Sequence, residues 1–134
     1  MASTTPSNDQ AEVILVGCGA PLRGMGWYHA VQMLGGECPS AKLCHVVEPW
    51  FLGAGSSGPG GPEFAEFRKK SEEEHSVRFH KSLSEVPPPP SSGGARRLAL
   101  ISGRTADNPK LLSEAIAAGC TTVYLEKPGE CRLY

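Results

Sequence analysis

The stretch Val13-Ile14-Leu15-Val16-Gly17-Cys18-Gly19 decides the fold of this chain. Its first four residues form a continuous apolar run that ends on glycine, which is typical of a strand buried on both faces of a parallel sheet. Gly17 permits a tight turn without a Cβ clash, and Gly19 lets a ligand approach the main chain. A helix after such a turn presents unpaired N–H groups and the positive end of its dipole, which suit a pyrophosphate.

Strand and helix signals alternate along the rest of the chain. Further strands are expected at residues 43–47, 77–79, 97–102 and 122–125. Helices are expected to start near Trp27, near Pro62 and at 108, with at most one helical turn over 82–86. This order predicts an α/β fold, a doubly wound parallel sheet of about five strands of the Rossmann type, with helices on both faces.

Apolar spacing and punctuation define the helices. Trp27, Ala30, Val31 and Leu34 share one face of the first helix, and Gly35-Gly36 ends it. Phe64 and Phe67 anchor the charge-rich second helix. The third helix has Asn108 as N-cap, Pro109 at its first position and Gly119 as a left-handed C-cap. Its expected apolar contacts come from Leu111, Leu112, Ala115, Ile116 and Ala118.

The domain organisation follows from composition. Residues 1–10 are small and polar and are expected to be disordered. Residues 11–134 are then one domain, with flexible loops at 53–62, rich in glycine and proline, and at 87–95, which contains four consecutive prolines.

Composition also excludes several classes of protein. The formal net charge is −1, and the basic run Arg68-Lys69-Lys70 is followed at once by three glutamates, so no nucleic-acid or membrane partner is expected. The chain has no apolar run of membrane-spanning length and no secretory signal pattern, which favours a cytoplasmic location. The five cysteines form no CxxC pair. The cysteines are therefore expected to be reduced thiols, and the chain is not expected to contain a metal site.

The turn after the first strand is enlarged. A standard GxGxxG fingerprint would place its third glycine at Leu22, whereas here Gly24 and Gly26 come later and Gly26 takes the third place. Arg23 lies within the enlargement, where it is either a phosphate ligand or an exposed loop residue. Gly17, Gly19, Arg23, Gly24 and Gly26 are therefore candidate cofactor-binding residues.

Glu48 ends the second strand, where a carboxylate accepts the ribose hydroxyls of adenosine. No arginine follows it directly, so a 2′-phosphate would meet negative charge, which favours NAD over NADP. Trp50 and Phe51 come next and either flank the adenine or belong to the core. After the fourth strand, Ser102, Gly103, Thr105 and Asn108 offer small side chains and free N–H groups to a dinucleotide.

Two motifs resemble one known family. Gly26-Trp27-Tyr28-His29-Ala30 and Glu126-Lys127-Pro128 are similar to the GxxH and EKP motifs in the Rossmann domain of the Gfo/Idh/MocA oxidoreductases. The resemblance covers about residues 12–129. It implies cofactor contacts from Glu126, Lys127 and Pro128, and a catalytic role for Lys127 in proton transfer. After the fourth strand the match to the family pattern is loose.

Members of that family carry a second α+β domain that holds a sugar-like or polyol substrate. This chain ends soon after the EKP motif, so it is expected to be truncated, to lack that domain and not to be a competent enzyme by itself. The expected partner is the dinucleotide, with a small-molecule substrate only if a second domain exists. The alternatives are a non-catalytic dinucleotide-binding module, an S-adenosylmethionine methyltransferase and a Rossmann-like structural domain without a ligand.

Overall fold

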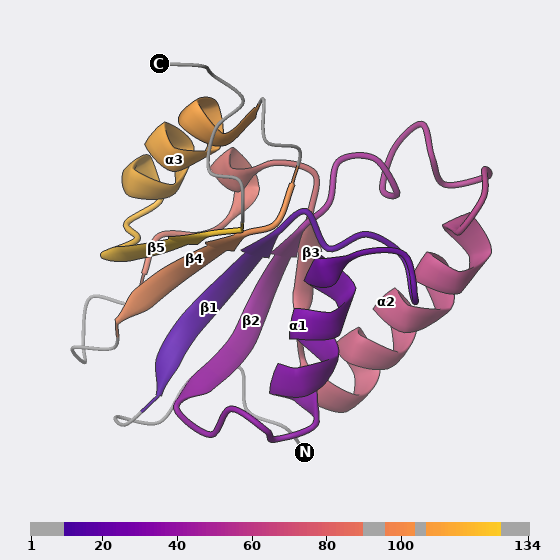
Figure 1. Ribbon diagram of the computed structural model, residues 1–134, viewed down its shortest axis with the longest axis horizontal. Helices are drawn as coiled ribbons and strands as arrows, with labels where there is room; N and C mark the ends of the chain where they lie inside the picture. Colours follow the sequence, from indigo (N-terminus) through magenta and orange to yellow (C-terminus); the bar gives the residue numbers. More distant parts are fainter. Residues whose placement is uncertain (1–9, 90–95, 104–106, 127–134) are drawn as a thin grey trace.

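Five strands form a parallel sheet, as Figure 1 shows for the computed structural model, which describes residues 10–89, 96–103 and 107–126. The strand order is β3-β2-β1-β4-β5, and all four neighbouring pairs are parallel. The expected α/β fold with five parallel strands is thereby confirmed. The strands are β1 (Ala11–Val16), β2 (Ala41–Val47), β3 (Arg78–His80), β4 (Arg97–Ile101) and β5 (Thr122–Leu125).

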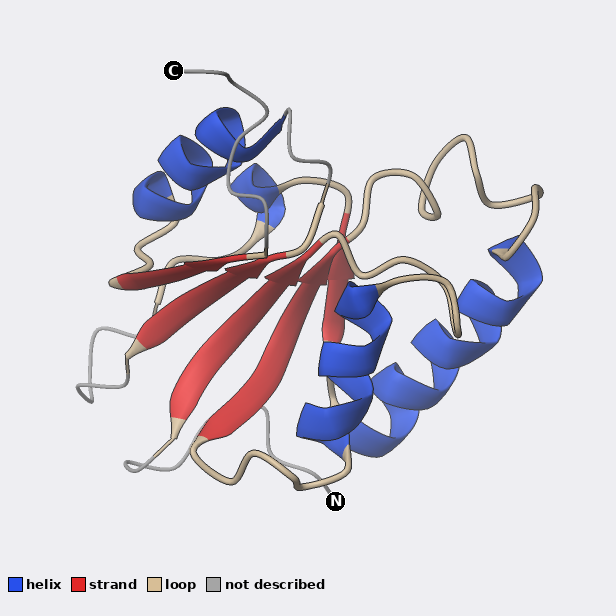
Figure 2. Ribbon diagram, viewed as in Figure 1, coloured by secondary structure: helices blue, strands red, loops and turns tan. Residues whose placement is uncertain are grey.

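Helices lie on both faces of the sheet (Figure 2). One face is covered by α1 (Met25–Leu34) and α2 (Gly61–His75), and the other by the short 3-10 helix η1 (Leu83–Glu85) and α3 (Asn108–Ala117). The chain moves outward from β1 through β2 to β3, then crosses back to β4 and β5. The strand order therefore reverses between β1 and β4, and such switch points leave a crevice at the carboxyl edge of a sheet.

Alternate residues of β1 serve the two halves of the core. Val13 and Leu15 pack towards α1, whereas Ile14 and Val16 pack towards η1 and α3. This two-sided burial explains the uninterrupted apolar run in the sequence.

Two helix positions differ from the expected core pattern. Val31 is 41% exposed and Ile116 is 62% exposed, so neither is a core residue. Met33 of α1 packs against the core on its face of the sheet. Leu111, Ala115 and Ala118, in α3 and at its end, belong to the core on the opposite face. The apolar stripe on each helix is therefore narrower than the sequence indicated.

The helix ends follow the glycine and proline signals, with one shift. Gly36 and Gly119 have positive φ angles of 80° and 88° just beyond α1 and α3. Asn108 is the first residue of α3 and Asp107 is its N-cap, so the predicted cap was one residue late. The segment that precedes α2 is a series of tight turns, since the N–H groups of Gly53 and Gly55 both donate to the carbonyl of Trp50.

A chain of buried polar side chains crosses the sheet beneath η1 and α3. Glu12 of β1 accepts a 2.6 Å hydrogen bond from Arg97 of β4 and lies 3.3 Å from Nε2 of His45 on β2. Nδ1 of His45 lies 3.0 Å from Nε2 of His80 on β3. Arg97 also donates to the carbonyls of Pro87 and Ala118, which ties the start of the proline run and the end of α3 to the sheet.

Burial and neighbouring charges shift the pKa values in this network. One hydrogen bond joins His45 Nδ1 to His80 Nε2, and His45 Nε2–H faces the Glu12 carboxylate. Burial and the neighbouring His45 and Arg78 lower the pKa of His80 to about 4. The hydrogen bond from His45, together with Arg97, lowers the pKa of Glu12 against the opposing effect of burial.

We expect this network to make the fold acid-sensitive. Because the pKa of His80 is lowered from 6.5 to about 4 on folding, its contribution is complete above pH 6.5 and is lost as the pH falls towards 4. Glu12 adds a loss at still lower pH, since its folded pKa is also lowered. His80→Gln should flatten the pH dependence of the free energy of unfolding between pH 6.5 and 4 by about 1–2 kcal/mol.

The matched control is the partly exposed His75 at the end of α2. Urea unfolding of the wild type, His80→Gln and His75→Gln at several pH values shows whether only the His80 substitution changes the pH dependence of the free energy of unfolding. An unaltered pH dependence in His80→Gln would show that the network does not set the acid sensitivity.

Candidate functional site

A cavity of about 960 Å³ lies at the carboxyl edge of the sheet, beside the switch point between β1 and β4. Its walls are the ends of β1, β2 and β4, the residues that follow β3, and the first turns of α3. This is the crevice in which open α/β sheets bind their ligands. We refer to it as the carboxyl-edge cleft.

Backbone contacts explain the first glycine of the turn after β1. Gly17 has a φ of +83°, and a Cβ on it would lie 2.6 Å from the amide nitrogen of Gly103. Only glycine therefore lets the end of β1 pass so close to the end of β4. Cys18 is fully buried in the same turn, and burial raises the pKa of its thiol, which keeps it protonated.

Gly26, the glycine that the sequence assigns to the third place of the fingerprint, packs against the turn. A Cβ on Gly26 would lie 2.3 Å from the carbonyl oxygen of Gly17, so the first turn of α1 packs directly on the turn. Gly19 differs from both, because its φ is +75° and the nearest atom to a Cβ would be the Arg23 oxygen at 3.6 Å. Gly19 therefore has a left-handed conformation and open space beside it.

Glu48 joins the turn to the next strand. Its Oε2 accepts a 2.9 Å hydrogen bond from the N–H of Gly19, and its Oε1 accepts from the N–H groups of Trp50 at 3.1 Å and Phe51 at 3.4 Å. The residue is only 5% exposed. A carboxylate has about four acceptor positions, so three donors leave capacity for a hydroxyl group.

The structure brings part of the predicted set together. Five of the candidate residues line the carboxyl-edge cleft: Gly17, Gly19, Glu48, Ser102 and Gly103. Asn108 is buried in the first turn of α3 but does not line the cleft. Thr105, Lys127 and Pro128 lie outside the described residues, so their expected roles stay predictions.

Arg23 and Gly24 lie away from the cleft lining. The Arg23 side chain lies against the loop before α2, where a Cβ on Gly60 would be 3.0 Å from its Cδ. Gly24 is the N-cap of α1 and has no atom within 4 Å of where a Cβ would be. The structure thus shows a loop contact for Arg23, and phosphate binding by Arg23 stays a prediction.

Two lysines in the cleft were not among the sequence candidates. Lys81 follows β3 and Lys110 lies in the first turn of α3, and both line the cleft with Glu48. The signal for Lys81 was its position directly after a strand, at the edge where ligands bind. Lys110 follows the predicted start of a helix, and its Nζ lies 3.8 Å from Glu114.

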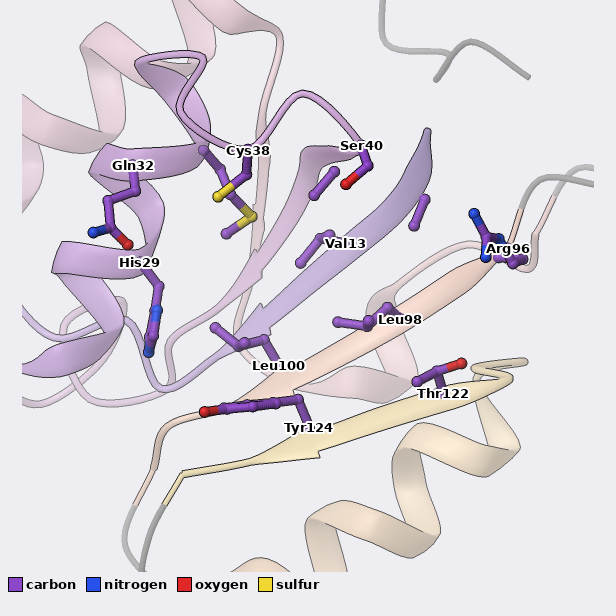
Figure 3. A pocket seen from close by; sticks show the side chains of 13 residues that line it. Val13, His29, Gln32, Cys38, Ser40, Arg96, Leu98, Leu100, Thr122 and Tyr124 are labelled. Atoms are coloured by element: carbon purple, nitrogen blue, oxygen red, sulfur yellow. The ribbon is translucent and has the colours of Figure 1, made fainter. Parts of the chain in front are cut away.

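Glu126 contacts His29, which was not among the candidate site residues from the sequence. Its Oε1 lies 2.5 Å from Nε2 of His29, the histidine of the Gly26-Trp27-Tyr28-His29 motif on α1. Figure 3 shows His29 and Tyr124 at one end of a hollow of about 390 Å³ between α1 and strands β4 and β5. One residue of each sequence motif, His29 and Glu126, therefore meets the other in space.

The described residues contain no cluster of side chains suited to a metal ion. The cysteines of the described ranges, Cys18, Cys38, Cys44 and Cys120, are free thiols. Within those ranges, no helix has the length and apolarity required to cross a membrane.

Comparisons with known proteins support the fold. No family model matches the chain, and no curated protein matches its sequence. Among solved structures it is similar to the WlbA dehydrogenase from Chromobacterium violaceum, which was crystallised in complex with NADH and UDP-GlcNAcA. The TM-score is 0.57 at 20% sequence identity, and the match covers 98% of this chain and 32% of that one. The chain thus spans about a third of that protein and shares the fold of the matched part.

Proposed function

We propose that this chain is an NAD-binding domain, the cofactor half of an oxidoreductase that acts on a sugar-like or polyol substrate. The observation that carries the proposal is the hydrogen bond between the Gly19 amide and the Glu48 carboxylate inside the carboxyl-edge cleft. It joins a glycine turn suited to a pyrophosphate with a carboxylate suited to ribose hydroxyls. The similar dehydrogenase structure, determined with NADH, supports the same assignment.

The cleft residues fit the two halves of a dinucleotide. The open space beside Gly19 admits a phosphate, and Lys81 lines the same cleft as a candidate cation for it. Lys110 also lines the cleft but is paired with Glu114. The remaining acceptor position on Glu48 suits a ribose hydroxyl. A 2′-phosphate in its place would face a carboxylate that is 5% exposed, which favours NAD over NADP.

The nicotinamide ring supplies hydride transfer when the cofactor is bound. In our proposal Lys127, which directly follows Glu126, positions the substrate and moves a proton. His29 fixes Glu126 from α1 and so fixes the start of the EKP segment. The substrate would be enclosed by a second domain, because hydride transfer requires both reactants to be oriented and water to be excluded.

Dinucleotide binding is the first test. Calorimetric titration of the purified chain should detect NADH binding, weaker binding of NADPH, and no binding of S-adenosylmethionine. Preference for S-adenosylmethionine would favour a methyltransferase. Absence of NADH binding at millimolar concentration, with the chain folded by circular dichroism, would refute the proposal.

Glu48→Ala should weaken NADH binding by about 1–3 kcal/mol, because the ribose hydroxyls and the Gly19 amide both lose their acceptor. The exposed Glu37, in the loop after α1, provides a control of equal charge change. Affinities of both variants are measured by calorimetry beside their unfolding midpoints. If Glu48→Ala and Glu37→Ala bind NADH equally well, the ribose contact lies elsewhere.

Gly19→Val should abolish NADH binding, because a branched side chain fills the space that a phosphate needs. Gly36→Val is a matched control, since Gly36 also has a left-handed φ of +80° and nothing within 4 Å of a Cβ, but lies at the other end of α1. Both variants carry a similar backbone penalty of about 1 kcal/mol or more. Equal loss of binding in the two variants would assign the effect to strain and contradict the phosphate placement.

A further inference from the structure

Trp50 is an unusual residue for the mouth of a cleft. It is 58% exposed, although tryptophan is normally well buried, and it lines the carboxyl-edge cleft two residues after Glu48. An exposed indole beside polar ligand groups is more typical of a binding surface than of a folding core.

The neighbouring aromatic residue has a different role. Phe51 stacks on Phe64 of α2 with ring centroids 5.3 Å apart, and Phe64 is 1% exposed. Phe64 in turn contacts Phe79 of β3. Phe51 therefore anchors the loop to the core although it also lines the cleft, whereas the more exposed Trp50 has no such stacking partner among the described residues.

The loop holds the indole from behind. A Cβ on Gly55 would lie 2.2 Å from Trp50 Nε1 and 2.4 Å from Cε2, so the ring lies directly on the Gly55 backbone. The Gly55 N–H also donates a 2.8 Å hydrogen bond to the Trp50 carbonyl. The glycine at position 55 thus provides a flat support that a larger residue would displace.

The backbone of Trp50 is hydrogen-bonded to Glu48, the carboxylate proposed to accept the ribose hydroxyls. Its N–H donates to Glu48 Oε1 at 3.1 Å. A base is attached directly to the ribose, so a base whose ribose hydroxyls meet Glu48 lies within reach of a side chain two residues away. The aromatic support and the ribose acceptor are therefore parts of one structure.

From these contacts we propose that Trp50, supported by Gly55, is the stacking platform for the adenine ring of the dinucleotide. The inference rests on the proposed function and assigns its adenine end. An indole presents a large, rigid π-surface to a purine, and such stacking contributes substantially to nucleotide affinity. The glycine-rich loop before α2 then has a function, which is to hold this platform at the cleft.

The chain contains two tryptophans, so one substitution isolates the signal. Trp27 packs against the α1 side of the core, and among the described residues its buried Nε1 has no hydrogen-bond partner, so Trp27→Phe should fold normally. In that background, ADP-ribose should quench Trp50 fluorescence and shield it from acrylamide about twofold. Nicotinamide mononucleotide, which lacks the adenine, should do neither.

Affinity measurements complete the test. Trp50→Ala should weaken ADP-ribose binding by about tenfold or more, and Trp50→Phe by less, because phenylalanine retains a stacking face. Gly55→Val should also weaken binding while Trp50 is still present, because it displaces the indole. Tyr28→Ala, which removes a similarly exposed aromatic ring from α1, should leave affinity unchanged.

The outcomes separate the two proposals. If calorimetry shows that the wild type binds neither NADH nor ADP-ribose, the proposed function fails. If the wild type binds both but Trp50 fluorescence does not respond and Trp50→Ala retains full affinity, the dinucleotide site stands and the platform is refuted.

Discussion

Three backbone segments converge on Gly17, and the architecture depends on that convergence. Gly103, two residues after β4, has its amide nitrogen 2.6 Å from where a Cβ on Gly17 would be, and the first turn of α1 at Gly26 lies against the Gly17 carbonyl. A side chain at either Gly17 or Gly26 would force a strand or a helix outward. The close approach aligns the end of β1 with the end of β4, and this alignment forms the floor of the carboxyl-edge cleft.

Two departures from a standard dinucleotide-binding domain are structurally connected. The enlarged turn after β1 and the glycine-rich loop before α2 contact each other, since a Cβ on Gly60 would meet Ala20 and Arg23 at 3.0 Å. The same loop supports Trp50 through Gly55. Glu48 links both segments to β2 through the amides of Gly19 and Trp50. The enlarged turn and the glycine-rich loop therefore form one unit around the adenosine end of the proposed site.

The fold was largely predictable from the sequence, because buried parallel strands leave continuous apolar runs and glycine and proline mark their ends. The pair of Gly17 and Glu48 was predictable for the same reason, since both directly follow a strand. Contacts between distant segments were not predictable from spacing alone. The His29–Glu126 pair and the network from His80 to Arg97 depend on which strands become neighbours. Likewise, only the packing shows that Phe51 stacks on the buried Phe64 while Trp50 is 58% exposed, although both line the cleft.

The central claim is that the carboxyl-edge cleft is where a nicotinamide dinucleotide binds. Its most direct test is a titration of the ¹⁵N-labelled chain with NADH, followed by the amide signals in heteronuclear correlation spectra. Our account predicts the largest shifts at the amides of Gly17, Gly19, Trp50 and Gly103, with little change at the amino ends of the strands. Shifts that cluster instead around the hollow between α1 and β5, or no shifts at saturating NADH, would contradict it.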